Sequence, residues 1–153
     1  VKGDGTHNIK ELVEEKNKDS LRGYKYRTPL EKINLGDIEK TFLRLQNKNF
    51  DYIPKKEEIV YLRENSNIST GGDSIDFTDD ILDKYKKIAV LAAQKVGAKI
   101  CGVDMIIEDY KKEDSNYGII ELNFNPAIHI HCYPYKGKER NIGEKILKLL
   151  EFI

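Results

Sequence analysis

Two apolar segments, GVDMII (102–107) and GIIELNFNP (118–126), decide the fold of this chain. Both are typical of β-strands, and the charged, turn-rich segment KKEDSNYG (111–118) between them predicts a hairpin. Helices are predicted before and after this pair of strands. The pattern therefore favours an α+β fold with an antiparallel or mixed sheet and flanking helices.

Three polar side chains interrupt these apolar strands: Asp104, Glu121 and Asn123. Because side chains alternate between the two faces of a strand, Glu121 and Asn123 are expected to share a face with Ile119. Symmetry about the turn predicts that Asp104 lies opposite Glu121. The same register sets Gly102 opposite Asn123 and leaves open space beside the amide.

Two carboxylates and an amide that converge in this way predict a metal site. Like charges directly opposite each other destabilise a sheet, and burying an unpaired carboxylate is costly, so a divalent cation is expected to neutralise the pair. Ligands that are all oxygen favour Mg²⁺ or Mn²⁺ over Zn²⁺. The alternative is a set of ordinary polar positions on a half-solvated sheet face. Three aligned oxygen donors favour the metal site at Asp104, Glu121 and Asn123.

Composition excludes several classes of protein. With 153 residues, 39% hydrophobic and 34% charged, the chain fits one globular domain or a large piece of a bigger one. Its 26 acidic and 26 basic residues give no net charge, which argues against binding to nucleic acid or a membrane surface through bulk charge. Cys101 and Cys132 form no C-x-x-C motif, so a reducing, cytoplasmic setting is expected. The chain opens at Val1 and its one methionine is Met105, which predicts a fragment of a larger protein.

Other elements are predicted from capping residues and apolar spacing. A helix is expected from Asn8, which with Glu11 has the spacing of a capping box. Further elements are a helix capped by Asp37, a strand over 58–64, a helix from Thr78 to Gly97, and a closing helix that carries Ile142, Ile146, Leu149 and Leu150.

The loop RENSNISTGGDS (63–74) is the second segment suited to ligand binding. Arg63 ends the predicted strand and offers a fork of donors for a phosphate or carboxylate. Thr70, Gly71 and Gly72 could turn successive backbone N–H groups toward an anion. Locally, an ordinary turn and a solvated arginine are the commoner outcome.

The segment His129-Ile130-His131 would place two imidazoles on one face if it were extended, with Cys132 adjacent. Only three ligands are then in view and a Tyr-Pro follows, so packed or polar histidines are favoured over a transition-metal site. The basic segment KGKER (136–140) is either a solvated surface or a guide for an anionic substrate.

Long segments of the chain resemble one family. LRENSNISTGGDSIDFT (62–78), AKICGVDMII (98–107) and GIIELNFNPAIHIHCYPYKGK (118–138) look like the C-terminal part of the ATP-grasp domain of bifunctional glutamate–cysteine ligase/glutathione synthetases. VKGDGTHNIKELVEEKN (1–17) and RTPLEKI (27–33) fit the same family, so the resemblance covers essentially all of residues 1–153. Cyanophycin synthetases are similar at GDG, STGG and E-x-N.

The resemblance implies an ATP-dependent carboxylate–amine ligase with ATP and Mg²⁺ or Mn²⁺ as cofactors. ATP would phosphorylate γ-glutamylcysteine, and glycine would displace phosphate to give glutathione. It also implies metal roles for Asp104, Glu121 and Asn123, with Glu121 bridging two ions. Arg63 would face the transferred phosphate as the catalytic arginine.

The same resemblance places one loop near the acyl phosphate or the acceptor: Asn67, Ser69, Thr70, Gly71 and Gly72. The family's lysines and adenine-contacting residues lie upstream of the matched segments, so the chain alone is expected to be inactive and to bind ATP poorly. The expected partners are small molecules and the rest of the parent chain. Alternatives are a cyanophycin-type or D-alanine-type ligase, or a non-catalytic cation-binding module.

Overall fold

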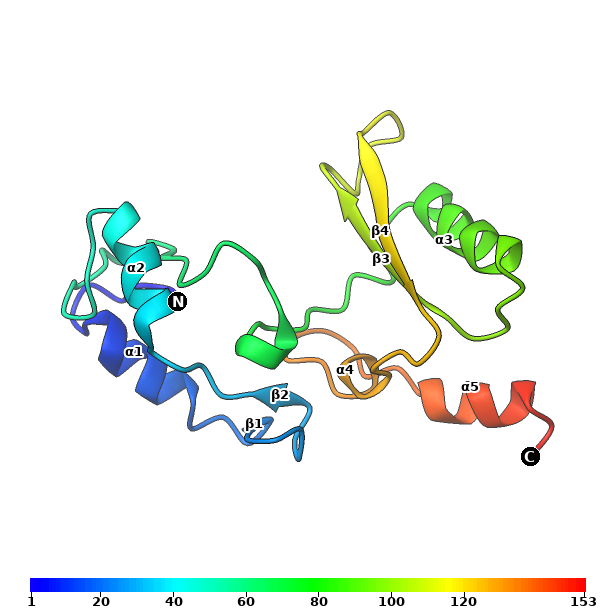
Figure 1. Cartoon of the computed structure of the whole chain (residues 1–153), viewed down its shortest axis with the longest axis horizontal. Coiled ribbons are helices and arrows are strands. Elements are labelled where there is room, and N and C mark those ends of the chain that lie inside the picture. Colours follow the sequence, from blue (N-terminus) through cyan, green and yellow to red (C-terminus); the bar gives the residue numbers. More distant parts are fainter. The chain divides into compact units, whose positions relative to one another are not determined.

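The computed structural model describes all 153 residues, and the chain divides into two compact units, Val1–Ser74 and Ile75–Ile153 (Figure 1). Helices and two small sheets give the α+β class that the sequence predicts. The first unit contains helices α1 (Ile9–Lys16) and α2 (Asp37–Leu45), strands β1 (Arg22–Gly23) and β2 (Leu30–Glu31), and the 3-10 helix η1 (Ile68–Thr70).

Helix α1 supplies two of the four residues of the main core cluster in the first unit. Asn8 and Glu11 form the predicted capping box, each side chain accepting from the other residue's backbone N–H at 2.9 Å. The stripe on the inner face of α1 packs against one residue of α2 and one of the segment that follows it. This core consists of Ile9, Val13, Leu43 and Val60.

Helix α2 begins one residue away from the predicted cap. Asp37 is its first helical residue, and the N-cap is Gly36, whose N–H donates to the Glu39 carboxylate at 2.8 Å. A carboxylate at the third helical position can satisfy the first free N–H group from inside the helix, so Asp37 is not needed as a cap.

The predicted strand over 58–64 is wrong. Ile59 forms only an isolated antiparallel bridge with Lys2, and the Val60 N–H donates to the Val1 carbonyl at 2.8 Å. The apolar character of this segment instead buries Val60 in the core. β1 and β2 pair in parallel over two residues each.

The second unit contains a hairpin packed against one helix. Its elements are α3 (Asp83–Lys95), β3 (Gly102–Ile107), β4 (Tyr117–Asn123), α4 (His129–Cys132) and α5 (Ile142–Leu149). α3 contacts the hairpin through Tyr85, which is buried and meets the Tyr117 ring edge-on at a centroid distance of 5.8 Å. None of the helices in the structure has the length and apolar character required to cross a membrane.

Helix α3 starts later than predicted. The Thr78 hydroxyl donates to Asp76 Oδ1 at 2.5 Å instead of capping the helix, and Leu82 is the N-cap. A local side-chain acceptor therefore competes with the helix for Thr78.

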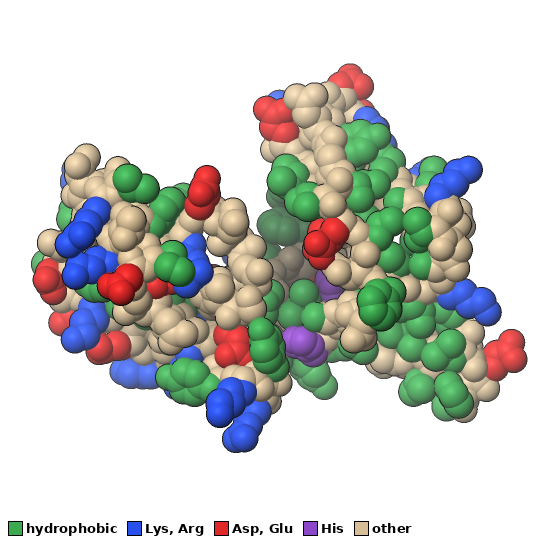
Figure 2. All heavy atoms as spheres, viewed as in Figure 1, with side chains coloured by type: hydrophobic (Ala, Val, Ile, Leu, Met, Phe, Trp, Pro, Cys, Tyr) green, Lys and Arg blue, Asp and Glu red, His purple; other side chains and the backbone are tan.

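Apolar side chains remain exposed on this unit, and in Figure 2 they gather around α3, the hairpin and α5.

Candidate functional site

The hairpin has the register that the sequence predicts. β3 and β4 are antiparallel, with Asp104 opposite Glu121 and Gly102 opposite Asn123. The two carboxylates therefore occupy directly opposed positions on one face of a two-stranded ribbon. Opposition of like charges is unfavourable unless a donor or a cation lies between them.

A β-bulge adjoins this pair. The register shifts between Asp104 and Met105, so Ile120 is the extra residue and Ile119 pairs with Met105. Ile119 therefore follows the face of Met105, and the expectation that it shares a face with Glu121 is wrong. The reason is that an extra residue interrupts the simple alternation of faces. Bulges often re-aim a side chain next to a functional site, and this one directly precedes Glu121.

The Asn123 amide joins the two carboxylates. Its Nδ2 donates to Glu121 Oε1 at 2.7 Å and to Asp104 Oδ2 at 3.3 Å. Asp104 and Glu121 are both exposed and neither forms an ion pair, so the expected burial of the pair is wrong. The open space expected beside the amide is also limited, because a Cβ at Gly102 would lie 3.0 Å from Pro126 Cβ.

This arrangement fits an oxygen-ligated cation. One nitrogen lies within hydrogen-bond distance of an oxygen of each carboxylate, so both oxygens converge on a single point. Rotating the Asn123 amide by half a turn places its oxygen at that point, and the choice of amide orientation follows the hydrogen-bond network. The amide oxygen and the two carboxylate oxygens would then lie next to one another. All three could bind one cation beside them, which suits Mg²⁺ or Mn²⁺.

The loop at 67–72 is folded on itself. The Asn67 side chain accepts from Ser69 N–H at 2.9 Å, and the Asn67 carbonyl accepts from Thr70 N–H at 3.1 Å and Gly72 N–H at 2.8 Å. Gly71 N–H donates to the Ile68 carbonyl at 3.0 Å. The sequence suggested that these N–H groups turn toward an anion, but the loop's own acceptors use them. What the loop offers a ligand is its exposed side chains, those of Asn67 and Ser69.

Both glycines of this loop are required by close packing. Gly71 has φ +93°, and a Cβ there would lie 2.7 Å from Ile33 Cγ1 and 2.8 Å from Ile33 Cα. A Cβ at Gly72 would lie 2.8 Å from the Asn67 carbonyl oxygen. The loop therefore closes tightly against the segment that follows β2.

Arg63 forms a pair with a buried acid on α2. Arg63 Nε donates to Glu39 Oε1 at 2.5 Å, and the Glu39 residue is only 3% exposed. Burial raises the pKa of the Glu39 carboxyl, but hydrogen bonds from the Gly36 and Glu39 N–H groups and from Arg63 outweigh it and hold the pKa below its ordinary value. The guanidinium lies beside a groove of about 430 Å³, lined by Asp37, Ile38, Thr41, Phe42, Leu45 and Glu64.

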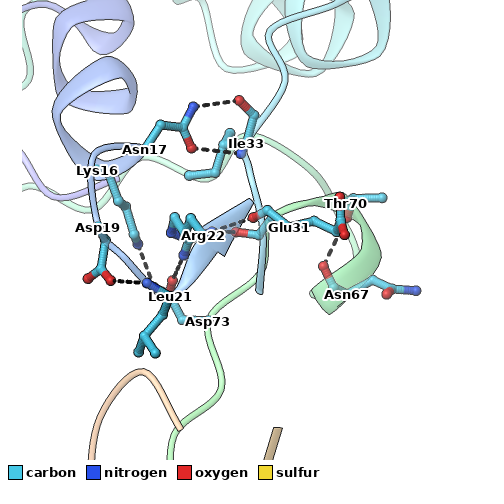
Figure 3. A network of polar contacts seen from close by, with 11 residues as sticks. Lys16, Asn17, Asp19, Leu21, Arg22, Glu31, Ile33, Asn67, Thr70 and Asp73 are labelled. Carbon is cyan, nitrogen blue, oxygen red and sulfur yellow. Dashed lines mark hydrogen bonds and ion pairs between the residues drawn. The ribbon is translucent and has the colours of Figure 1, made fainter. Parts of the chain in front are cut away.

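Sequence reasoning missed a buried ion-pair network in the first unit, shown in Figure 3. Arg22 of β1 is 4% exposed and pairs with Asp73, which also accepts from Lys16 Nζ at 2.5 Å. Arg22 Nη1 donates to the carbonyls of Glu31 at 2.8 Å and Gly71 at 3.0 Å. The segment before β2 has the composition of a polar loop, and Leu21 is the one apolar residue next to Arg22.

A second cluster lies in the second unit. Arg140 donates to Asp76 Oδ2 from Nε at 3.0 Å and from Nη2 at 2.5 Å, and it pairs with Asp79 at 3.1 Å. Arg140 and Lys138 lower the pKa of Asp79 to about 2, and Arg140 holds the pKa of Asp76 still further below its usual range. The basic segment 136–140 thus packs against acids.

His129 and His131 lie in the short helix α4 and not in an extended segment.

Comparison with known proteins identifies the family. The model of the RimK-like ATP-grasp domain matches residues 60–150, which is more than half of the chain. This chain belongs to the RimK-like ATP-grasp family. The matched range includes Arg63, the loop at 67–72 and the whole hairpin.

Relatives within this ATP-grasp family are close in sequence. A glutathione biosynthesis bifunctional protein from Clostridium perfringens is 63% identical over 152 residues, covering 98% of this chain and 20% of the relative. The protein of the same name from Listeria monocytogenes is 56% identical over 150 residues, again covering 98% of this chain and 20% of the relative. The crystal structure of a bifunctional glutathione synthetase from Pasteurella multocida matches with a TM-score of 0.87 and 47% identity, covering 100% of this chain and 22% of that one. The ATP-grasp fold expected from the sequence is thereby confirmed, and the chain spans about a fifth of the length of these relatives.

Proposed function

We propose that this chain is part of an ATP-dependent carboxylate–amine ligase that joins γ-glutamylcysteine to glycine and forms glutathione. The observation that carries the proposal is the convergence of the Asp104 and Glu121 oxygens on the Asn123 amide, in a chain of the RimK-like ATP-grasp family. High identity to glutathione biosynthesis bifunctional proteins supports the choice of substrates.

The hairpin triad, which consists of Asp104, Glu121 and Asn123, would hold Mg²⁺ or Mn²⁺ together with ATP. A bound divalent ion neutralises the charge that develops on the phosphates during phosphoryl transfer. Asp104 and Glu121 supply two carboxylate oxygens on one face, and Asn123 completes the set by turning its amide oxygen toward them. Because both acids are exposed to solvent, a cation can replace the Asn123 N–H group as their partner. Neither carboxylate has to be uncovered first.

Arg63 is proposed to face the transferred phosphate. Its Nε is held by Glu39, so the side chain is oriented while its two terminal amino groups are left for an anion. Asn67, Ser69, Thr70, Gly71 and Gly72 are proposed to lie near the acyl phosphate or the acceptor amine. For this loop the contacts to a ligand would come from side chains, since its backbone N–H groups are used internally.

The activity is tested in the full-length protein that contains the chain. With ATP and γ-glutamylcysteine present, glycine is expected to support phosphate release and formation of glutathione. Release with aspartate or arginine as acceptor, and none with glycine, would favour a cyanophycin-type ligase. D-alanine as both acid and amine tests the D-alanine type. Lack of ATP-dependent amide formation with every pair would leave the non-catalytic cation-binding module.

The 153-residue chain alone gives a second test. Isothermal titration with Mg-ATP is expected to show only weak binding, because the chain spans about a fifth of its relatives. Sub-millimolar affinity would overturn this expectation.

We also propose a cytoplasmic location, which the two free cysteines, Cys101 and Cys132, support.

A further inference from the structure

The buried arginine of β1 reaches the proposed acceptor loop directly. Arg22 Nη1 donates to the Gly71 carbonyl at 3.0 Å, and Arg22 Nη2 donates to Asp73, the residue that follows the double glycine. Arg22 Nη1 also donates to the Glu31 carbonyl of β2 at 2.8 Å. One guanidinium therefore ties the C-terminal side of the loop to the small parallel sheet (Figure 3).

The other side of the loop at 67–72 packs on Ile33, whose backbone is held by the Asn17 amide. Asn17, just after α1, donates from Nδ2 to the Ile33 carbonyl at 2.9 Å and accepts from the Ile33 N–H at 2.8 Å. This double contact fixes the backbone of Ile33, on which Gly71 packs without room for a Cβ. The turn is thus held between Arg22 and Ile33, while the Asn67 and Ser69 side chains at its tip are exposed.

From this geometry we propose that Arg22 is a positioning residue for the acceptor step: it holds the loop at 67–72 in the shape that keeps the amine, and not water, beside the acyl phosphate. The proposal rests on the proposed function. Arginine suits this task because its planar fork serves three acceptors from two segments, β2 and the end of the loop, at fixed angles. Lysine has a single nitrogen on a flexible stem and cannot span the same acceptors.

Charge balance explains why the arginine can be buried. The Arg22 side chain is 0% exposed, and Asp73 supplies its counter-charge. Lys16 Nζ contacts the other Asp73 oxygen at 2.5 Å, at a site that is about a quarter exposed. Lys16 therefore adds a second positive charge beside the Asp73 carboxylate.

The chemistry gives a readout that separates positioning from stability. An acyl phosphate has two fates: the amine nitrogen attacks the carbonyl carbon, forms the C–N bond and expels inorganic phosphate, or water attacks and returns the free acid with phosphate. A displaced loop allows the second fate. Phosphate released per amide bond formed therefore rises. A variant that merely unfolds part of the protein lowers both products together and leaves their ratio unchanged.

The test compares Arg22→Lys with Arg27→Lys in the full-length protein, with ATP, γ-glutamylcysteine and glycine. Arg27 is an exposed arginine of the same segment and serves as the matched control. For Arg22→Lys we expect the ratio of phosphate to amide to rise several-fold and the KM for glycine to rise about tenfold or more, since small displacements of positioning groups have large effects on rate. Arg27→Lys is expected to keep both values. An unchanged ratio in Arg22→Lys, with only less active protein, overturns the proposal.

A second measurement keeps this inference separate from the proposed function. If the unchanged protein forms no glutathione, the proposed function fails, and amide hydrogen exchange of residues 69–72 then tests Arg22 by itself. Faster exchange of these amides in Arg22→Lys than in Arg27→Lys supports the role of Arg22 in holding the loop. Equal exchange in the two variants overturns it.

Discussion

The loop at 67–72 and the triad on the hairpin are both polar, but they are held in different ways. The loop satisfies its own backbone groups and is fixed from outside by Arg22, which is 4% exposed. The two carboxylates of the triad are exposed on a two-stranded ribbon, Asn123 beside them is half-buried, and the three side chains are joined by the two hydrogen bonds that Asn123 donates. One site is shaped before a ligand arrives, whereas in the other the Asn123 N–H group occupies the place that its amide oxygen would take beside a cation.

The two sites therefore differ in what a substitution should change, the stability of the fold or the binding of a ligand. Substitutions that disturb the loop remove buried hydrogen bonds or create a backbone clash, so they should change the free energy of unfolding. Substitutions in the triad remove exposed carboxylates that repel each other, so they should spare folding and act on ligand binding. The following variants test that separation.

Glu121→Gln should have the largest effect on activity. The amide keeps the shape of the side chain but removes a charge that a cation needs, so turnover of the full-length protein should fall by roughly 100-fold or more. The melting temperature should stay close to that of the unchanged protein, because Glu121 is exposed and forms no ion pair. Steady-state kinetics and calorimetry measure both quantities. Lost stability with normal turnover would favour a structural role for Glu121.

Gly71→Ala should have the largest effect on stability. A Cβ would lie 2.7 Å from Ile33 Cγ1, and φ is +93°, so both a clash and backbone strain oppose the new side chain. Urea unfolding should show a loss of about 2 kcal/mol or more. Gly97→Ala is the matched control, since Gly97 has φ +71° but open space around it, and its loss should be smaller. Equal losses would mean that the close approach to Ile33 contributes nothing.

Glu39→Gln tests the acid that orients Arg63. The glutamine oxygen can still accept from the Gly36 N–H, but the charge that pairs with Arg63 is lost from a site that is 3% exposed. Loss of a hydrogen bond to a charged group predicts a decrease of about 1–3 kcal/mol in the free energy of unfolding. Glu64→Gln, an exposed change next to Arg63, should be nearly neutral. If the two variants unfold alike, the buried pair does not hold Arg63.

The sequence predicts the hairpin well because two independent signals agree there. Apolar runs mark both strands, and the turn residues between them set the register, so the opposition of Asp104 and Glu121 follows. The bulge at Ile120 leaves no comparable signal, since one extra apolar residue in an apolar strand changes no pattern. The exposure of the carboxylates was also missed, because periodicity shows which face a residue occupies and not what covers that face.

The anchors of the loop could not be predicted for a different reason. Arg22 and Asp73 are 51 residues apart in the chain, and neither belongs to a periodic segment that would indicate burial or a partner. Burial of an arginine depends on a partner that only the folded chain brings near. The same holds for Asp76 and Arg140, which are 64 residues apart. Long-range ion pairs between loops therefore escape a reading based on local pattern.

This second anchored cluster extends the comparison to pH, with the smallest expected effect. Arg140 and Lys138 lower the pKa of Asp79 to about 2, and Arg140 lowers that of Asp76 further. A carboxyl whose pKa is lower in the folded than in the unfolded state stabilises the fold above its unfolded pKa of about 4 and loses that contribution as the pH falls through the folded value. Stability should therefore fall between about pH 4 and pH 2.

Carbon-13 NMR of the aspartate carboxyls at successive pH values measures this directly. In Arg140→Gln the pKa values of both Asp76 and Asp79 should rise toward the ordinary range, since Arg140 contacts both. In Lys138→Gln only that of Asp79 should rise, because the Lys138 ammonium contacts Asp79 at 2.5 Å, and its contact with Asp76 comes from the backbone N–H, which the substitution keeps. A rise of both in Lys138→Gln would show that charge in general, and not the paired geometry, sets these values. The acids of this cluster would then respond to the surrounding charge, as exposed carboxylates do, and not to a fixed geometry like that of the loop at 67–72.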